Sequence, residues 1–517
     1  MRAIVLAAAL ALAGCAAAAP PPQTEIAQPA FSPSETAEAR TRAALARIAQ
    51  LNPRLRAVIA VDPTALDQAR RLDASAGPRG PLFGMPILVK DNIDTLGPLP
   101  TTAGSLALLG NVTDRDAPLV ARLRAAGAVI VGKANLSEWA NFRSSDSISG
   151  WSAVGGQTRN PHALDRNACG SSTGSAVAVA AGMVPAAIGT ETNGSITCPA
   201  AINGIVGFKP TVGLVSRTHI VPISASQDTA GPMARTVREA AQVLDAIAGS
   251  DSADPATAEA DRRRQPYAAQ LNPDSLRGRR IGVMRFAAGF GTDHPFEQAL
   301  DTLRAQGAVL VDIAEFPNRA EMNRNALQVL LHEFKDGLNR YLATTPPSVA
   351  TRTLAQLIEF NRAHAEQEMP LFAQELFERS EATEGLTDAY RRARETSFRM
   401  AGPDGIDRLL REHDVDILVG PTMPAAWFID AVHGDVIAGG GGGGLAAIAG
   451  YPHLTVPMGD LRGLPVGISF IGPQWADGLV LSVGYAYEQA SRRRIEPRFL
   501  PSIEETPEVL RAFEPAR

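Results

Sequence analysis

The chain has 517 residues, a length that fits one large domain or two to three ordinary ones. Its composition, 45% hydrophobic and 20% charged, is that of a globular protein with a large core. The net charge of −5 and the lack of a long basic run in the sequence argue against nucleic acid or an anionic membrane surface as a partner.

The first residues have the composition of an export signal. Arg2 precedes an apolar run over residues 3–13 that is too short to span a bilayer as a stable helix. The segment Leu12-Ala13-Gly14-Cys15 resembles the processing box of bacterial lipoproteins. Residues 1–15 would then be a lipoprotein-type signal segment, and its cleavage would leave Cys15 as a lipid-bearing N-terminus. An ordinary secretory signal, cut after a small residue, is the alternative. Either signal predicts an exported, periplasmic protein, with the Ala- and Pro-rich residues 16–30 as a flexible tether.

Helical and extended patterns alternate after the tether. Helices are predicted over residues 34–50, 64–74, 116–126, 236–248, 295–306 and 476–491, and strands over 57–61, 87–89, 129–131, 184–188, 280–285, 417–419, 454–457 and 464–472. The first helix should end at Asn52-Pro53, because proline disfavours helical backbone in the residue before it. Residues 319–413 are almost wholly helical in pattern and predict a helical cap, whereas six consecutive glycines over 439–444 predict a mobile loop. The alternation favours an α/β fold with a mixed central β-sheet covered on both faces by helices.

A lysine follows one of the predicted strands directly. Residues 87–89 are apolar, and Lys90 is the next residue. A lysine at a strand end is usually a solvated surface residue. At the tip of a buried strand, loss of hydration would instead lower the pKa of the amine by as much as ~3–5 units and provide a neutral base. The position of Lys90 alone is compatible with both interpretations.

Two Gly/Ser clusters, Gly170-Ser171-Ser172 and Gly194-Ser195, lie on either side of a small-residue helix and a short strand. Glycine beside serine permits tight turns that expose a hydroxyl and let backbone N–H groups approach a ligand. Two such turns can bring two hydroxyls together, which suits nucleophilic acyl transfer. Phosphate binding is the alternative for a Gly-rich turn, but neither G-x-x-x-x-G-K-[ST] nor G-x-G-x-x-G between a strand and a helix occurs in the sequence.

Two cysteines lie beside these clusters. Apart from Cys15, Cys169 and Cys198 are the cysteines of the chain, so the sequence has no disulfide framework, and no metal-ligand spacing is visible. An oxidising compartment would allow a disulfide between them, but we expect two small buried thiols.

Three motifs, taken together, resemble the amidase signature family. They are Gly84-x-Pro86-x-x-Val89-Lys90-Asp91, Gly170-Ser171-Ser172-x-Gly174-Ser175 and Gly189-Thr190-Glu191-x-x-Gly194-Ser195-Ile196. The resemblance covers most of the chain after the leader, because residues 207–210, 421–422 and 463–467 also follow the family's order. Within the family, residues 137–143 and 192–200 are most similar to bacterial peptide amidases, which remove ammonia from C-terminally amidated peptides.

The resemblance implies a mixed α/β fold with one amidase domain over residues 31–510 and a mostly helical insertion around 319–413. It places the family's base on Lys90, its bridging serine, held on a cis peptide bond, on Ser171, and its nucleophile on Ser195. The backbone N–H groups of Thr192, Asn193, Gly194 and Ser195 would form the oxyanion hole, where one donor can be worth ~3–4 kcal/mol to the transition state. A peptide or small-molecule amide is the implied substrate, and no metal, organic cofactor or obligate subunit is implied.

Three positions differ from the commonest sequence of the family's motifs. Cys169 stands where glycine is frequent, Glu191 replaces aspartate, and Asn193 replaces glycine. None of these changes removes a catalytic side chain, and asparagine tolerates positive φ better than most residues. Their expected effect is therefore on the shape of the substrate site near the oxyanion hole.

Other functions compete with a peptide amidase. A Ser-His-Asp hydrolase would need a nucleophile elbow and a partnered histidine, but the eight histidines are scattered. A glutamine-dependent transamidase subunit belongs to the same family but works in the cytoplasm with partner subunits, and the leader argues against it. Amidases of aryl, aliphatic or cyclic amides use the same residues. The last alternative is a lipid-tethered binding protein that kept the fold without the chemistry.

Substitution of Cys15 tests the anchor. If lipid is attached there, Cys15→Ser removes the acceptor sulfur, and the mature protein should move from the membrane fraction to the soluble periplasmic fraction. Cell fractionation with metabolic fatty-acid labelling measures this shift. An unchanged membrane-bound, processed protein would show that the lipoprotein prediction is wrong.

Overall fold

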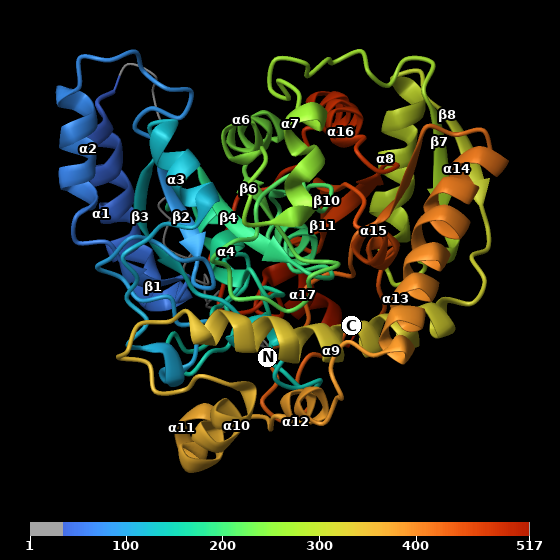
Figure 1. The fold of residues 1–517 in the computed structure, drawn as a ribbon. Coiled ribbons are helices and arrows are strands. Elements are labelled where there is room, and N and C mark those ends of the chain that lie inside the picture. Colours follow the sequence, from blue (N-terminus) through green and yellow to red (C-terminus); the bar gives the residue numbers. More distant parts are fainter. Residues whose placement is uncertain (1–34, 516–517) are drawn as a thin grey trace, which may run out of the picture.

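The computed structural model describes residues 35–515, so the leader, the tether and Cys15 lie outside the described residues. An 11-stranded mixed sheet crosses the molecule in the order β1-β3-β2-β4-β6-β5-β10-β11-β9-β7-β8, with helices on both faces (Figure 1). The predicted α/β architecture is confirmed. Within residues 35–515, none of the helices combines the length and apolarity that a membrane span requires.

The strands are β1 (Val58–Val61), β2 (Pro86–Lys90), β3 (Val129–Ala134), β4 (Ala186–Glu191), β5 (Val206–Lys209), β6 (Thr229–Ala234), β7 (Arg280–Met284), β8 (Val309–Ile313), β9 (Ile417–Pro421), β10 (His453–Leu461) and β11 (Leu464–Ile471). The helices before residue 319 are α1 (Ala37–Leu55), α2 (Ala65–Ala74), α3 (Pro118–Ala125), α4 (Thr173–Ala180), α5 (Thr197–Ile202), α6 (Val237–Ile247), α7 (Ala260–Arg263) and α8 (Asp293–Ala305). The remaining helices are α9 (Arg319–Ala343), α10 (Leu354–Ala363), α11 (Ala365–Glu368), α12 (Glu375–Glu381), α13 (Asp388–Ala401), α14 (Asp407–Glu412), α15 (Gly443–Ala449), α16 (Asp477–Ser491) and α17 (Pro507–Phe513).

Parallel pairing at one side of the sheet brings the carboxyl ends of two strands together. Strand β2 lies between β3 and β4 and is parallel to both, with Val89 opposite Ile188 of β4. The carboxyl ends of β2 and β4 therefore meet at one edge, so that Lys90 lies beside Thr190. Ligand sites in α/β proteins form preferentially at such carboxyl ends.

The core lies on both faces of the sheet. On one face α3, α6, α8 and α16 pack apolar side chains against the strands, and on the other α1, α4 and α5 do so. Helix α4 is wholly buried and is built from small and β-branched residues (TGSAVAVA), which lets it approach the sheet closely. A Cβ on Gly174 would lie 2.1 Å from the backbone oxygen of Ala57, so this helix position requires glycine. This close packing fixes the Gly/Ser turn that precedes α4.

The predicted end of the first helix is wrong. Helix α1 continues through Pro53 to Leu55, with Thr36 as its N-cap. Burial of Leu51 and Leu55 holds the last turn in the core, and the side chain of Asn52 exchanges two 2.8 Å hydrogen bonds with the backbone of Val58. These tertiary contacts outweigh the local preference of the residue before proline.

Residues 319–413 contain helices α9–α14, as the pattern predicted. The long helix α9 runs along the lower side of the molecule in Figure 1, with α10, α11 and α12 below it. Its side chains form a core with residues from the loop after β3: Phe334 packs against Phe142, and Phe377 of α12 packs against Trp139. The helical region is thereby packed directly against the loops at the end of the sheet.

Candidate active site

Lys90 is the last residue of β2 and is completely buried. Its Nζ donates to Ser171 Oγ at 2.7 Å and to Thr190 Oγ1 at 2.8 Å. Burial lowers the pKa of Lys90 to about 7, although the negative charges of Asp228 and Glu191 act in the opposite direction. A substantial fraction of the amine is therefore neutral near pH 7, and its lone pair can accept the hydroxyl proton of Ser171.

Ser171 lies in the turn before α4, and the Gly170-Ser171 peptide bond is cis, as the resemblance implied. Its backbone oxygen accepts a hydrogen bond from the N–H of Ser137 at 3.1 Å. A Cβ on Gly170 would lie 2.1 Å from Ser137 Oγ, so only glycine fits in this turn. The turn directs the fully buried Ser171 hydroxyl toward Lys90.

Ser195 lies in the loop between β4 and α5, beside the turn that carries Ser171. The N–H of Ser172 donates to the backbone oxygen of Ser195 at 3.1 Å, which joins the two loops. Gly194 has φ +83, a left-handed conformation that favours glycine. Ser195 is 9% exposed and lines a cavity of about 640 Å³. The structure thus brings the two Gly/Ser clusters together, as their spacing suggested.

The loop of the predicted oxyanion donors is held from both sides. Thr192 Oγ1 donates to Asp228 at 2.5 Å, and Gln227 Nε2 donates to the backbone oxygen of Thr192 at 3.2 Å. On the other side, the Glu191 carboxylate accepts the backbone N–H groups of Ile196 and Thr197 at 2.8 and 3.0 Å. Thr192, Asn193, Gly194 and Ser195 all line the cavity. No signal in the sequence indicated the role of Gln227 and Asp228, which lie 32 or more positions from Ser195 in a polar turn.

An Amidase family model matches residues 39–481. The chain belongs to the amidase signature family. The crystal structure of peptide amidase from Stenotrophomonas maltophilia is 53% identical, with a TM-score of 0.86 over 90% of this chain and 96% of that chain. A probable amidase of Arabidopsis thaliana is 40% identical over 88% of this chain and 87% of its own length. A glutamyl-tRNA(Gln) amidotransferase subunit of Symbiobacterium thermophilum is 37% identical over 87% of this chain and 92% of its own length. The protein is thus an enzyme that hydrolyses amide bonds.

The cavity of this amidase, called here the front cavity, is roofed by the helical region and by the glycine run. Helix α9 contributes mainly apolar side chains, and residues 440–444 form part of the wall, with α15 beginning at Gly443. Asp435 also lines the cavity; it accepts hydrogen bonds from Asn167 Nδ2 at 2.9 Å and Trp427 Nε1 at 3.0 Å, and burial raises the pKa of its carboxyl. The front cavity can therefore hold a substrate with both apolar and hydrogen-bonding groups.

Other buried bases in the amidase have different partners. The buried Lys133 lies 3.8 Å from Asp91, and Lys209 donates to the backbone oxygen of Pro210 at 3.1 Å. His453 lines the front cavity, but its Nε2 contacts Ser469 Oγ at 2.7 Å, and burial lowers its pKa to about 4. Across residues 35–515, no group of three or more His, Cys, Asp and Glu side chains could hold a metal ion. Lys90 is thus the base that contacts the Gly/Ser turns.

Cys169 and Cys198 form a disulfide, so the expectation of two buried thiols is wrong. Their Cα atoms are 6.1 Å apart, within the range that a disulfide spans. The helix and strand between the two Gly/Ser turns return the chain to its starting point, so that the cysteines beside the two turns meet. Cys169 precedes the turn of Ser171, and Cys198 lies in α5, just after Ser195. The disulfide therefore fastens together the two loops of the site.

Reduction of this disulfide should destabilise the amidase. A crosslink between residues 29 positions apart restricts the unfolded chain, and its loss should lower the free energy of unfolding by about 2–5 kcal/mol. Urea denaturation with and without a reductant measures the difference. The Cys169→Ala/Cys198→Ala variant is the control, because it should not respond to the reductant. Titration of two free thiols in the denatured, unreduced protein would contradict the pairing.

Proposed function

We propose that this amidase releases ammonia from C-terminal peptide amides through an acyl-enzyme on Ser195. The observation that carries the proposal is the buried Lys90, whose pKa is lowered to about 7 and whose amine contacts Ser171 at 2.7 Å. The loop of Ser171 is joined to the loop of Ser195 by a backbone hydrogen bond, from the N–H of Ser172 to the oxygen of Ser195. A neutral amine, a bridging hydroxyl and a second hydroxyl facing a cavity are the groups that a proton relay to a nucleophile needs.

Acylation would proceed in two stages. As Ser195 Oγ attacks the amide carbon, its proton passes to Ser171, and the proton of Ser171 passes to the neutral amine of Lys90. The backbone N–H groups of residues 192–195 stabilise the oxyanion, each where negative charge develops. The relay then runs in reverse and protonates the leaving nitrogen, which departs as ammonia. Water attacks the remaining ester through the same relay and frees Ser195.

The substrate class is supported by two observations. The Stenotrophomonas maltophilia protein of 53% identity is a peptide amidase. The front cavity, at about 640 Å³, has room for more than a simple amide, and its lining includes the polar residues Asp435 and Ser149 as well as mainly apolar side chains of α9. A peptide chain presents alternating amide groups and side chains, which this mixture of surfaces can accommodate.

The protonation state of Lys90 predicts the pH profile. Because only the neutral amine accepts a proton, kcat/KM should rise with pH through about 7, by about tenfold per unit on the acid side. Asp228→Asn keeps an oxygen for the Thr192 hydroxyl but removes a negative charge that raises the pKa of Lys90, so the rise should move to lower pH. Initial rates on a peptide amide over a range of about pH 5–10 measure both profiles.

Substitutions complete this test. Ser195→Ala should abolish turnover, and Ser171→Ala and Lys90→Ala should each lower kcat by about 10²–10⁴-fold. Lys133→Ala is a matched control for removal of a buried lysine, since any loss of activity there should follow a loss of folded protein. A Lys90→Arg variant with the normal rate would contradict the role of a neutral amine.

A substrate panel tests the specificity. Ammonia release is measured from C-terminally amidated peptides, from peptides that contain side-chain amides of Asn and Gln, and from simple aryl, aliphatic and cyclic amides. We expect the highest kcat/KM for amidated peptides, with the corresponding free-acid peptides as inert controls. Turnover confined to the simple amides would overturn the peptide-amide assignment while leaving the relay in place.

A further inference from the structure

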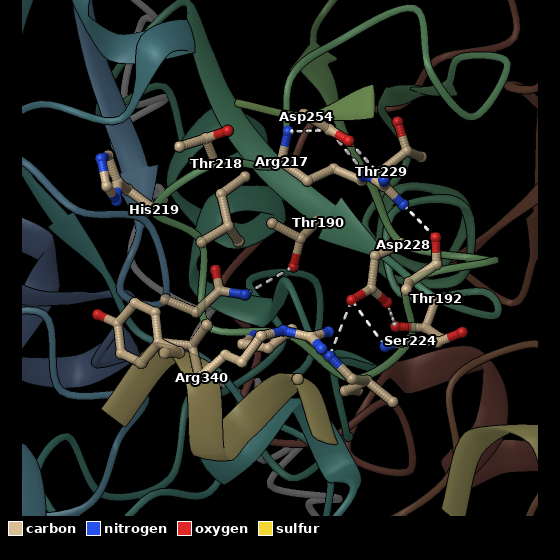
Figure 2. A pocket seen from close by; sticks show the side chains of 18 of the residues that line it. Thr190, Thr192, Arg217, Thr218, His219, Ser224, Asp228, Thr229, Asp254 and Arg340 are labelled. Atoms are coloured by element: carbon tan, nitrogen blue, oxygen red, sulfur yellow. Dashed lines mark hydrogen bonds and ion pairs between the residues drawn. The ribbon is translucent and has the colours of Figure 1, made fainter. Parts of the chain in front are cut away.

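A second cavity lies beside Thr190, which contacts the catalytic lysine. It has a volume of about 400 Å³ and is called here the rear cavity; its walls include Asn92, Thr190, Thr192, Ile223 and Asp228. Figure 2 shows the polar residues around it, with Arg217 and Arg340 on different sides. Thr192 and Ile223 also line the front cavity, whereas Ser195 lines only the front one. The two cavities therefore share part of their walls. Thr190 lines the rear cavity but not the front one.

Thr190 connects Lys90 to the rear cavity. Its Oγ1 accepts hydrogen bonds from Lys90 Nζ at 2.8 Å and from Asn92 Nδ2 at 3.0 Å. Two donors occupy both lone pairs of the hydroxyl oxygen, so its own hydrogen must point away from Lys90 and Asn92. Asn92 Oδ1 is buried and has no hydrogen-bond partner within residues 35–515. Thr190 lines the rear cavity, so a water molecule there can accept a hydrogen bond from its hydroxyl.

The hydrolytic reaction leaves a proton that must be removed. The product is a carboxylic acid with a pKa of about 3.5, and Lys90, with a pKa of about 7, is the stronger base. The acid proton therefore passes through Ser195 and Ser171 to Lys90, which leaves a carboxylate in the front cavity and an ammonium on Lys90. In that state the amine cannot act as a base. The product itself blocks the front route to solvent.

We propose that Thr190 and the rear cavity form a proton exit for Lys90, used while the product fills the front cavity. Lys90 gives a proton to Thr190 Oγ1, and Thr190 gives its own hydroxyl proton to a water molecule in the rear cavity. One N–H bond breaks and one O–H bond forms in the first transfer, and one O–H bond breaks and another forms in the second, so Lys90 becomes neutral and the water carries the charge away. This inference rests on the proposed relay. The first turnover does not need the exit, because Lys90 becomes protonated by the product only at its end.

The charges around the rear cavity are compatible with this route. Burial raises the pKa of Asp228 to about 6, so its carboxylate can take up a proton near neutral pH. The two cations are paired, Arg217 with Asp254 at 2.6 Å and Arg340 with Asp336. Burial and the charge of Arg115 keep the pKa of His219 below its usual range, so it adds little positive charge. Glu191, the other charge that acts on Lys90, is held on the far side by Ile196 and Thr197.

The first test obstructs the rear cavity without touching the relay. Ala225 is exposed and lines the rear cavity, so Ala225→Cys, modified with a bulky thiol reagent, should narrow it. The activity is measured with an amidated peptide in two modes: hydrolysis, and acyl transfer to hydroxylamine, whose hydroxamate product is too weak an acid to protonate Lys90. We expect steady-state hydrolysis to fall by about tenfold and transfer to stay within about twofold.

Controls separate obstruction from general damage. Ala382→Cys, exposed at the end of α12 and outside both cavities, is modified with the same reagent, as is the parent enzyme; mass spectrometry confirms each modification. In small, diffusible imidazole buffer the hydrolysis deficit of modified Ala225→Cys should shrink, because the buffer can remove the proton. Equal loss of hydrolysis and transfer, or loss of neither, would overturn the proton exit.

The second test changes the link itself. Thr190→Val keeps the shape of the side chain but removes the hydroxyl, and Thr190→Ser keeps the hydroxyl. The readout is the ratio of the hydrolysis rate to the rate of acyl transfer. Any effect of the substitution on Lys90 that changes both rates equally cancels in this ratio. The ratio should fall about tenfold in Thr190→Val and recover in Thr190→Ser. An unchanged ratio in Thr190→Val would refute the route. Failure of the proposed relay would appear separately, as activity retained in Ser195→Ala.

Discussion

The desolvation of Lys90 is the physical constraint on which the site depends. An ammonium ion is stabilised by water, and at the end of β2 it is shielded from solvent, so its pKa falls to about 7. Two hydroxyls, those of Ser171 and Thr190, take the place of water around the amine. Both can exchange protons with it, which is why the same burial that neutralises the lysine also gives it routes for protons. The negative charges of Asp228 and Glu191 prevent a still larger fall in the pKa.

The sheet explains why these groups meet. Parallel pairing of β2 with β4 brings the ends of the two strands together, so that Lys90 Nζ reaches Thr190, and the buried small-residue helix α4 brings the Ser171 turn close to both. The disulfide between Cys169 and Cys198 then fastens the Ser171 turn to the Ser195 loop. Peripheral regions add the walls of the substrate site: α9 and the glycine run cover the front cavity, and the C-terminal half of α9 also borders the rear cavity. One rigid arrangement of strand ends thus supports both cavities.

The sequence predicted most of what depends on local pattern. The α/β alternation, the helices over 319–413 and the proximity of the two Gly/Ser turns could all be inferred from periodicity and turn chemistry. Strand β8 was missed although four of its five residues are apolar; it is an edge strand, and Ile313 is its one buried residue. The end of α1 was misplaced because burial of Leu55 is a tertiary effect. For the same reason the support of Thr192 by Asp228 and the rear cavity could not be predicted: each joins segments distant in sequence.

The most direct test of the account is the pKa of Lys90 in the folded enzyme. The chain has only four lysines, Lys90, Lys133, Lys209 and Lys335, so an enzyme labelled with ¹³C at lysine Cε gives few resonances, and Lys90→Arg assigns the one of interest. An NMR titration of that resonance should give a pKa of about 7, and the resonance should be perturbed by Ser171→Ala. A Lys90 that stays fully protonated until above about pH 10, the range of a solvated lysine, would contradict the neutral base and with it the proposed mechanism.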